Sequence, residues 1–262
     1  MLFKRELKRN LKSFLVTILI CGFMIVWVVS MSKKMGPDIK TILDLKFPGP
    51  LQEAFGMANL DFGSAKSFFA LIFSYIYLFL AIYIAGVFAT IMSKEFSDKT
   101  AEYLFSLPVP RFRIIATKLS VSLLYFVVII ILMFFLSWIS FAMNIKGSFD
   151  LKLITLFSLA WLIGGLVFAS LAFLISSFFP YSKSISSVSV ILIMVMYMLQ
   201  IVIAVNDKLD NLKYISPFDW FKGSEIANTM SLDTTYCLIG VFVIIVSIAI
   251  GFRRFLKSDV LI

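Results

Sequence analysis

The sequence has 262 residues, of which 61% are hydrophobic and 15% charged, and its formal net charge is +9. Its mean hydropathy of +1.00 is far above that of soluble domains, in which about 45–50% of residues are apolar, so an ordinary water-soluble protein is excluded. The sequence contains no histidine, which excludes imidazole metal sites and His-based catalytic triads.

Six long apolar stretches, each of 19 to 27 residues, contain no charged residue. A helix of about 20 residues crosses a hydrocarbon core about 30 Å thick, and a charge at its centre costs roughly 2.5–3.5 kcal/mol. The sequence therefore predicts an all-α integral membrane protein with six transmembrane helices. Because the loops are too short to fold alone, we expect one transmembrane domain over residues 1–262. The predicted spans are residues 13–32, 67–93, 119–143, 153–178, 185–205 and 234–252.

The distribution of charge predicts the orientation. Placing both termini in the cytoplasm puts 14 of the 24 Lys and Arg residues, but only 5 of the 15 Asp and Glu residues, on that side. Basic residues near span ends favour the cytoplasmic side. The basic surplus then faces anionic lipid headgroups, so the bilayer is the expected partner and no nucleic acid is needed to explain the charge.

Residues 1–12 carry a pattern typical of a short amphipathic helix. Phe3, Leu7, Leu11 and Phe14 recur every three or four residues, while basic residues fill the other faces. The pattern predicts an elbow helix lying in the membrane interface, with a plain basic anchor as the alternative. The apolar run 14–30 is 17 residues long and exceeds the hydrophobic region of a signal peptide, so we expect it to be retained.

The first predicted outer segment, residues 33–66, is the longest polar piece of the chain. It contains the helix breaker Phe47-Pro48-Gly49-Pro50, followed by a predicted short helix over Leu51–Met57. No chemistry is indicated by its residues.

Residues 94–107 form the most informative polar segment. Phe96, Tyr103, Leu104 and Leu107 lie on one helical face with Thr100 between them, and Pro108 and Pro110 end the segment. The opposite face carries mixed charge, and Glu95 and Lys99 have the favourable i,i+4 order. Such a helix suits docking to another protein; the alternative is an ordinary inter-span helix lying on the membrane. The charged positions are Lys94, Glu95, Asp98, Lys99 and Glu102.

Within the spans, small residues recur at helical spacing. Ala81, Ala85 and Ala89 form one strip, and Gly165 and Ala169 form a second pair, both typical of close helix packing. The fifth span instead carries flexible methionines, with Met194 and Met198 on one face and Gln200 nearby. Methionine fills cores and also suits surfaces that accept varied apolar shapes, so both interpretations are open.

The last outer segment, residues 206–233, is aromatic around Tyr214–Phe221. Tyr and Trp gather at membrane interfaces, so an aromatic belt is one interpretation. The other is a pair of short helices that dip into the outer leaflet before the sixth span.

Several chemistries lack their residues. The predicted spans contain no Asp, Glu, Lys, Arg or His, which argues against a proton relay or an ion site. No GxxxxGKS/T phosphate loop occurs, so ATP is not expected to bind this chain by that route. With no HExxH and no intramembrane carboxylate pair, neither a catalytic residue nor a bound metal or cofactor is expected on this chain.

Residues 93–118 resemble the signature region of bacterial ABC-2-type permeases. Such permeases carry an acidic residue, a Thr-x-Glu, a leucine-rich step to Leu-Pro-Val, an Arg before an Ile-rich run, and a basic residue. The matching positions are Glu95, Thr100-Ala101-Glu102, Leu104–Val109, Arg111, Ile114-Ile115 and Lys118. Lys99 stands where the family commonly has glycine. Residues 214–221 and the basic N-terminal helix resemble the aromatic segment and the elbow helix of these permeases.

The resemblance implies the permease subunit of an ATP-driven exporter in a bacterial plasma membrane, paired with a second copy of itself or with a related permease. Separate cytoplasmic ATP-binding subunits carry ATP and Mg. The segment 94–107 becomes the coupling helix that docks on them, and the second and fifth spans line the substrate path at the dimer interface. The implied coupling residues are Glu95, Phe96, Lys99, Glu102, Tyr103, Leu104 and Leu107, and the implied path residues are Met194, Met198 and Gln200.

A path poor in polar groups suits a hydrophobic or amphipathic substrate. Small permeases that export amphipathic peptides or bacteriocins, such as the phenol-soluble-modulin exporter type, are similar in size and loop layout. Two other functions remain open from the residues: an ATP-independent channel or scramblase, and a membrane sensor or immunity protein that binds a peptide without transport. An intramembrane enzyme is a more distant alternative.

Overall fold

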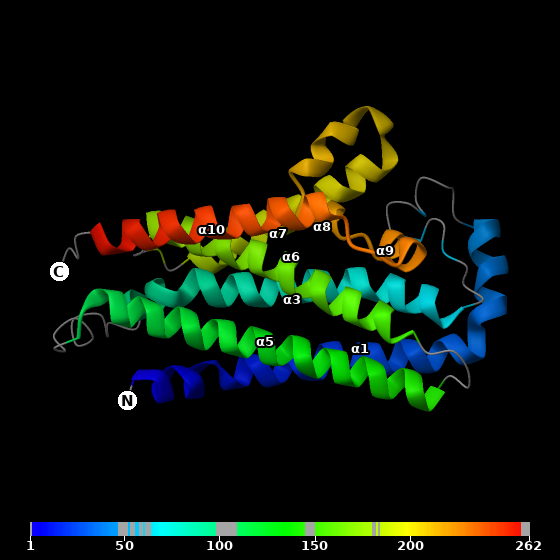
Figure 1. Ribbon diagram of the computed structural model, residues 1–262, viewed down its shortest axis with the longest axis horizontal. Coiled ribbons are helices and arrows are strands. Elements are labelled where there is room, and N and C mark those ends of the chain that lie inside the picture. The colour runs from blue at the N-terminus through cyan, green and yellow to red at the C-terminus, as the bar shows by residue number, and fades with distance from the viewer. Residues whose placement is uncertain are drawn as a thin grey trace.

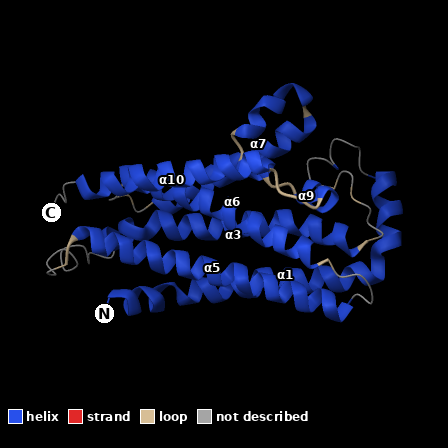
Figure 2. Cartoon of the chain, in the orientation of Figure 1, coloured by secondary structure: helices blue, strands red, loops and turns tan. Residues whose placement is uncertain are grey.

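The computed structural model describes residues 2–46, 52, 56–57, 60, 64–97, 109–144, 150–179, 182 and 184–257. Almost all of these residues lie in helices, and no described residue belongs to a β-strand (Figure 2). The predicted all-α class is therefore confirmed.

Six long helices form the bundle. They are α1 (Leu2–Lys46), α3 (Ala65–Ser97), α5 (Arg111–Asn144), α6 (Leu151–Phe178), α7 (Ile185–Val205) and α10 (Thr234–Lys257). Each is long and apolar enough to cross a membrane. All six predicted spans are thus confirmed as helices, and α7 has the same bounds as its prediction. Most of the other helices extend beyond the predicted spans because they continue into the polar ends.

Helix α1 differs from the prediction at both ends. It runs without a break from Leu2 to Lys46, so the predicted elbow helix is not a separate element but the first turns of α1. It also continues into the predicted outer segment and bends sharply at the end of the bundle (Figure 1). The bent helix contains Gly36-Pro37, and proline kinks a helix because it has no N–H to donate. The predicted breaker 47–50 lies outside the described residues, as does most of the predicted helix 51–57.

Helices α3 and α6 form the centre of the bundle and approach each other closely. At Gly164 of α6 an added Cβ would lie 1.9 Å from the Tyr77 Oη of α3, and at Gly165 it would lie 2.2 Å from the Phe126 Cζ of α5. Only glycine lets the three helices pack at this distance. Trp161 of α6 fixes their register, because its ring stacks on Phe73 at 5.3 Å and its Nε1 donates to the Phe73 carbonyl.

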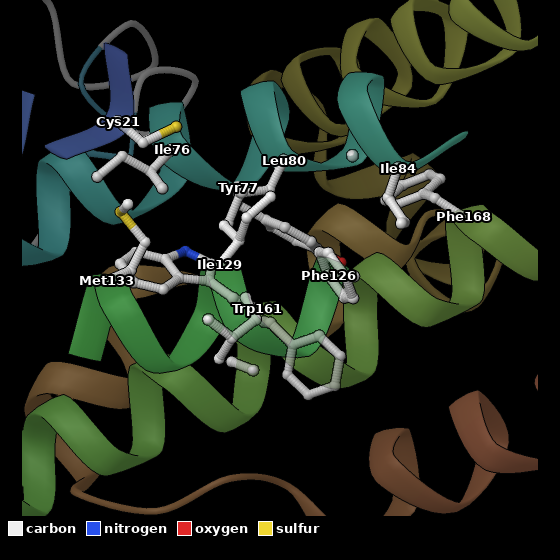
Figure 3. Packing of buried hydrophobic residues seen from close by; sticks show 14 of the residues in the cluster. Cys21, Ile76, Tyr77, Leu80, Ile84, Phe126, Ile129, Met133, Trp161 and Phe168 are labelled. Atoms are coloured by element: carbon white, nitrogen blue, oxygen red, sulfur yellow. The ribbon is translucent and has the colours of Figure 1, made fainter. Parts of the chain in front are cut away.

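The core is continuous through α1, α3, α5 and α6 (Figure 3). Cys21 of α1, Ile76 and Leu80 of α3, and Ile129 and Met133 of α5 are all buried in it. The alanine strip of α3 also packs inside the bundle, since Ala81, Ala85 and Ala89 are fully buried. Helices α7 and α10 contribute much less to the core and leave most of their apolar surface exposed.

Both chain termini lie at one end of the bundle, which we call the termini end (Figure 1). Three short helices precede α10 toward the other end: η1 (Asp207–Tyr214), α8 (Pro217–Trp220) and α9 (Gly223–Thr229). All four residues of α8 are buried, and Tyr77 of α3 donates a hydrogen bond to the Pro217 carbonyl at 3.2 Å. The predicted short helices are therefore present, with α8 buried in the protein rather than exposed to lipid.

Candidate functional site

The candidate site is at the termini end, where α3 ends and α5 begins. Residues 98–108, which connect these helices, lie outside the described residues. The predicted coupling residues Lys99, Glu102, Tyr103, Leu104 and Leu107 therefore have no described position. Phe96 belongs to the last turn of α3, but its side chain is not described. The one predicted coupling residue with a described side chain is Glu95.

Glu95 is completely buried, with a side-chain exposure of 0%. Its Oε1 accepts hydrogen bonds from the Nζ of Lys118 and from the Nη1 of Arg9, both at 2.6 Å. Its Oε2 accepts from the Nη2 of Arg5 at 2.9 Å. One carboxylate of α3 thereby binds three cations, two from α1 and one from α5.

Glu6 completes this group of ion pairs. The Nη2 of Arg9 donates to its Oε2 at 2.6 Å, and the Nζ of Lys118 lies 3.4 Å from its Oε1. Lys118 also donates to the backbone carbonyl of Ile91 at 3.0 Å. A cation near the carboxyl end of a helix interacts favourably with the helix dipole, so Lys118 stabilises the last turns of α3. We call these five charged residues the Glu95 cluster: Arg5, Glu6, Arg9, Glu95 and Lys118.

The charges of the Glu95 cluster balance in its interior. Glu6, Glu95 and Lys118 are at most 3% exposed and Arg9 is 20% exposed, whereas Arg5 is 40% exposed. The four most buried side chains are thus two carboxylates and two cations. A buried ion is tolerated when it is paired and hydrogen-bonded, and removing one partner leaves an uncompensated charge. The cluster therefore fixes α1, α3 and α5 to one another at this end.

The two predicted path methionines of the fifth span lie outside the core. The buried face of α7 consists of Ile185, Ser189, Ile193 and Ile203. Met194 and Met198 are 39% and 54% exposed, and Gln200 is half-buried. The two methionines therefore lie on the outer surface of this chain, and core filling is not their role in it.

The described residues contain no group of three or more His, Cys, Asp and Glu side chains arranged to hold a metal ion. The acidic side chains at the termini end instead bind the cations of the Glu95 cluster. The described acidic side chains of this site therefore hold helices together.

Comparison with protein families assigns the chain. Residues 2–260 match the model of the ABC-2 family transporter protein. The chain belongs to the ABC-2 transporter family. Comparison with individual curated proteins finds no match. Family membership and six membrane-spanning helices make the chain a multi-pass membrane component of an ABC transporter, a class whose permeases pair with ATP-binding subunits.

The structure corrects the sequence prediction for Glu95 of this ABC-2 protein. We expected Glu95 to pair with a partner at the rim of a docking helix, but its carboxylate has no exposed surface and faces Arg9 and Lys118. The physical reason is that α3 continues to Ser97, which keeps Glu95 within the bundle and beside two buried cations.

The other four members of the Glu95 cluster, Arg5 among them, were not predicted to form a site. Arg9 was expected to face lipid headgroups, and neither Glu6 nor Lys118 was assigned a site of its own. Two signals were available in the sequence. Glu6 is the only acidic residue in the basic segment 1–12, and Glu95 closely follows the second predicted span while Lys118 directly precedes the third. Adjacent spans joined by a short loop end at the same membrane surface, so an acid and a base at these positions are favourably placed to meet.

Proposed function

We propose that this ABC-2 protein is the permease subunit of an ATP-driven exporter in a bacterial plasma membrane, with both termini in the cytoplasm. The observation that carries the proposal is the family match over residues 2–260. The termini lie at the same end of the bundle, because an even number of spans returns the chain to the side on which it began. The basic residues of α1 and the start of α5 lie at that end, which favours the cytoplasmic side.

The energy source is proposed to be a separate cytoplasmic subunit. Because this chain carries no phosphate-binding loop, ATP and Mg bind the partner, and this chain performs no catalysis itself. The permease contributes the membrane path and transmits the movement of its partner.

The proposed docking segment is residues 94–107. Phe96, Tyr103, Leu104 and Leu107 form its apolar face, and Lys99 and Glu102 lie at its rim. An apolar centre with a charged rim is typical of a protein docking surface. In this proposal Glu95 acts from inside the bundle, where it fixes the base of the segment, rather than by touching the partner.

This docking proposal is tested by co-purification. Leu104→Asp adds a charge to the apolar face, and Glu102→Lys reverses a charge at the rim, so both are expected to weaken binding of the ATP-binding subunit and abolish substrate-stimulated ATP turnover. The matched control is Ser106→Asp, which adds the same charge on the opposite side of the predicted helix. Normal co-purification and turnover in the Leu104→Asp and Glu102→Lys variants would remove the segment from the proposal.

The proposed partner within the membrane is a second copy of the chain or a related permease. Helix α7 supports this, because an apolar row along it is exposed in the single chain: Ile191, Met194, Val195, Met198 and Val202. We propose that the second permease lies along this face and that Met194, Met198 and Gln200 line the path between them. Flexible thioethers at a path suit a hydrophobic or amphipathic substrate, such as a peptide toxin or an antimicrobial peptide of the phenol-soluble-modulin type.

Disulfide cross-linking tests this arrangement. After both native cysteines are replaced, Met198→Cys is expected to cross-link two permeases in the membrane. Phe135→Cys on α5, a residue that is 46% exposed, is the control that is expected to remain uncross-linked. Cross-linking at the control position alone would assign the pairing face to α5 instead.

Export itself is tested with the permease and its ATP-binding subunit in proteoliposomes. ATP is expected to drive a fluorescent amphipathic peptide across the membrane, and vesicles without the ATP-binding subunit are expected to be inactive. Equal peptide movement without ATP would instead indicate a channel or scramblase, and peptide binding without movement would indicate a sensor.

A further inference from the structure

The first turns of α1 are attached to α5 as well as to α3. Beyond the ion pairs of Arg9, the Tyr125 hydroxyl of α5 donates to the Leu7 carbonyl at 2.5 Å. Two turns further along α1, the rings of Phe14 and Tyr125 lie 4.7 Å apart. The segment is therefore attached to the protein by ion pairs, a hydrogen bond and a ring contact, rather than resting on lipid alone.

The attachment point lies at the base of the α3–α5 connection. Glu95 is two residues before Ser97, where α3 ends, and Lys118 is the eighth residue of α5, which begins at Arg111. Any force applied to the connection reaches the bundle through these two helix ends. The Glu95 cluster joins them directly through the Lys118–Glu95 contact of 2.6 Å.

Arg9 is the member that brings α1 into this junction. Its two terminal nitrogens bind two different carboxylates, Glu6 on its own helix and Glu95 on α3, each at 2.6 Å. Without Arg9, Lys118 would be the one strongly buried cation beside the two carboxylates among the residues that the structure describes. Arg5 cannot replace Arg9 fully, because its side chain is 40% exposed and reaches a single oxygen of Glu95. Neutrality inside the cluster thus depends on Arg9.

We propose that the first turns of α1 are a positioning element for the segment that connects α3 to α5, and that Arg9 is the positioning residue that links them. Through Arg9, the ends of α1, α3 and α5 move as one unit. A movement of the connection then moves the ends of all three helices together, rather than changing the conformation of the loop alone. This inference rests on the proposed function, in which that connection docks on an ATP-binding subunit.

The test compares two variants that each remove one positive charge from the same helix. Arg9→Met breaks the link to Glu95, and Lys8→Met removes an exposed cation from the neighbouring position, so both change the charge of the segment equally. Arg9→Lys is the conservative variant, which keeps the charge but cannot hold both carboxylates with a planar fork.

The first readout is amide hydrogen exchange of residues 91–97 in the purified permease, which needs no partner. Arg9→Met is expected to speed exchange there by about tenfold or more, the effect of losing a charged hydrogen bond, while exchange in α6 stays unchanged. Lys8→Met is expected to match the wild type, and Arg9→Lys to lie between. Equal exchange in Arg9→Met and Lys8→Met would overturn the positioning role.

The second readout is substrate-stimulated ATP turnover in the reconstituted complex. Arg9→Met is expected to retain the ATP-binding subunit but to lose stimulation about tenfold or more, since the coupling contact and not the docking face is altered. Full stimulation in Arg9→Met, with the partner bound, would contradict this inference alone. If the wild-type chain binds no ATP-binding subunit, the proposed function fails, while the exchange experiment still decides whether Arg9 positions the end of α3.

Discussion

Replacing Glu95 by Gln is expected to destabilise the fold strongly, because the substitution keeps the shape of the side chain and removes its charge. Glu95 is 0% exposed and accepts from Arg5, Arg9 and Lys118 at 2.9, 2.6 and 2.6 Å. In Glu95→Gln the buried Lys118, which is 1% exposed, loses its closest counter-ion. One buried positive charge is then left without compensation.

The magnitude follows from the balance of charges. Breaking a buried ion pair by removing one partner costs about 3–5 kcal/mol. Replacing both partners is much less costly, because no buried charge is left unpaired. The double variant Glu95→Gln/Lys118→Met leaves Arg9 paired with Glu6 at 2.6 Å, and Arg5 is exposed enough to reach water. We therefore expect the double variant to be more stable than Glu95→Gln.

The assay is equilibrium unfolding by SDS titration in mixed micelles, followed by labelling of a buried thiol. Cys21 is 1% exposed and reports unfolding once Cys237 has been replaced by Ala. A matched control is available at the opposite end of α3, where Lys66 lies 3.5 Å from Asp150 and both side chains are partly exposed. Lys66→Gln is expected to cost under about 1 kcal/mol, as for a surface pair.

Two results would refute this reasoning. If Glu95→Gln costs no more than Lys66→Gln, the carboxylate is not a buried counter-ion. If the effects of Glu95→Gln and Lys118→Met simply add in the double variant, the two side chains are not coupled, because residues in one ion-pair network show interaction energies of about 0.5–3 kcal/mol.

The close packing of α3, α6 and α8 leads to the remaining predictions. Gly164→Ala is expected to destabilise the fold by about 1–3 kcal/mol through overpacking, since the new Cβ would lie 1.9 Å from the Tyr77 Oη. Gly86→Ala is its control, because the nearest atom there is 3.6 Å away; equal unfolding midpoints for the two variants would contradict the close approach. Tyr77→Phe is expected to cost about 1 kcal/mol by freeing the Pro217 carbonyl. It is expected to lose part of that cost in the Gly164→Ala background, where the hydroxyl is the nearest of the Tyr77 atoms to the new Cβ. Additive effects in this pair, measured by the same titration, would exclude a contribution of the hydroxyl to the clash.

The six spans could be predicted from the sequence because the bilayer imposes a length and an apolar composition on each helix. The agreement is closest for α7, which lies between residues typical of helix ends. The unbroken α1 could not be predicted, because proline and charged residues at 33–46 favour a loop when local preferences alone are considered. Helix continuity there is decided by the arrangement of the whole chain.

The Glu95 cluster escaped prediction for a related reason. Helical periodicity shows which residues share a face, but it does not show what that face contacts. Arg9 and Arg5 lie opposite Phe3, Leu7 and Leu11, so a helix at a lipid surface would turn them to water. The structure instead turns them to Glu95, and it leaves Phe3 and Leu11 exposed. The direction of that face depends on the neighbouring helices α3 and α5, and the periodicity of α1 carries no information about their positions.

The exposed methionines of α7 illustrate the converse. Their shared face followed from their spacing, but whether that face is core or surface required the positions of α3 and α6. Ile193 is buried while Met194 and Met198 are exposed, so the boundary between core and outer surface runs along α7 itself.

The most direct test of the account is purification of the chain from its native membranes in mild detergent, with quantification of any ATP-binding subunit that accompanies it. We expect a roughly equimolar ATP-binding subunit with the wild type and with Ser106→Asp, and its loss with Leu104→Asp. If the folded wild-type chain purifies without any ATP-binding subunit, as the variants do, its assignment as the permease of an ATP-driven exporter is contradicted.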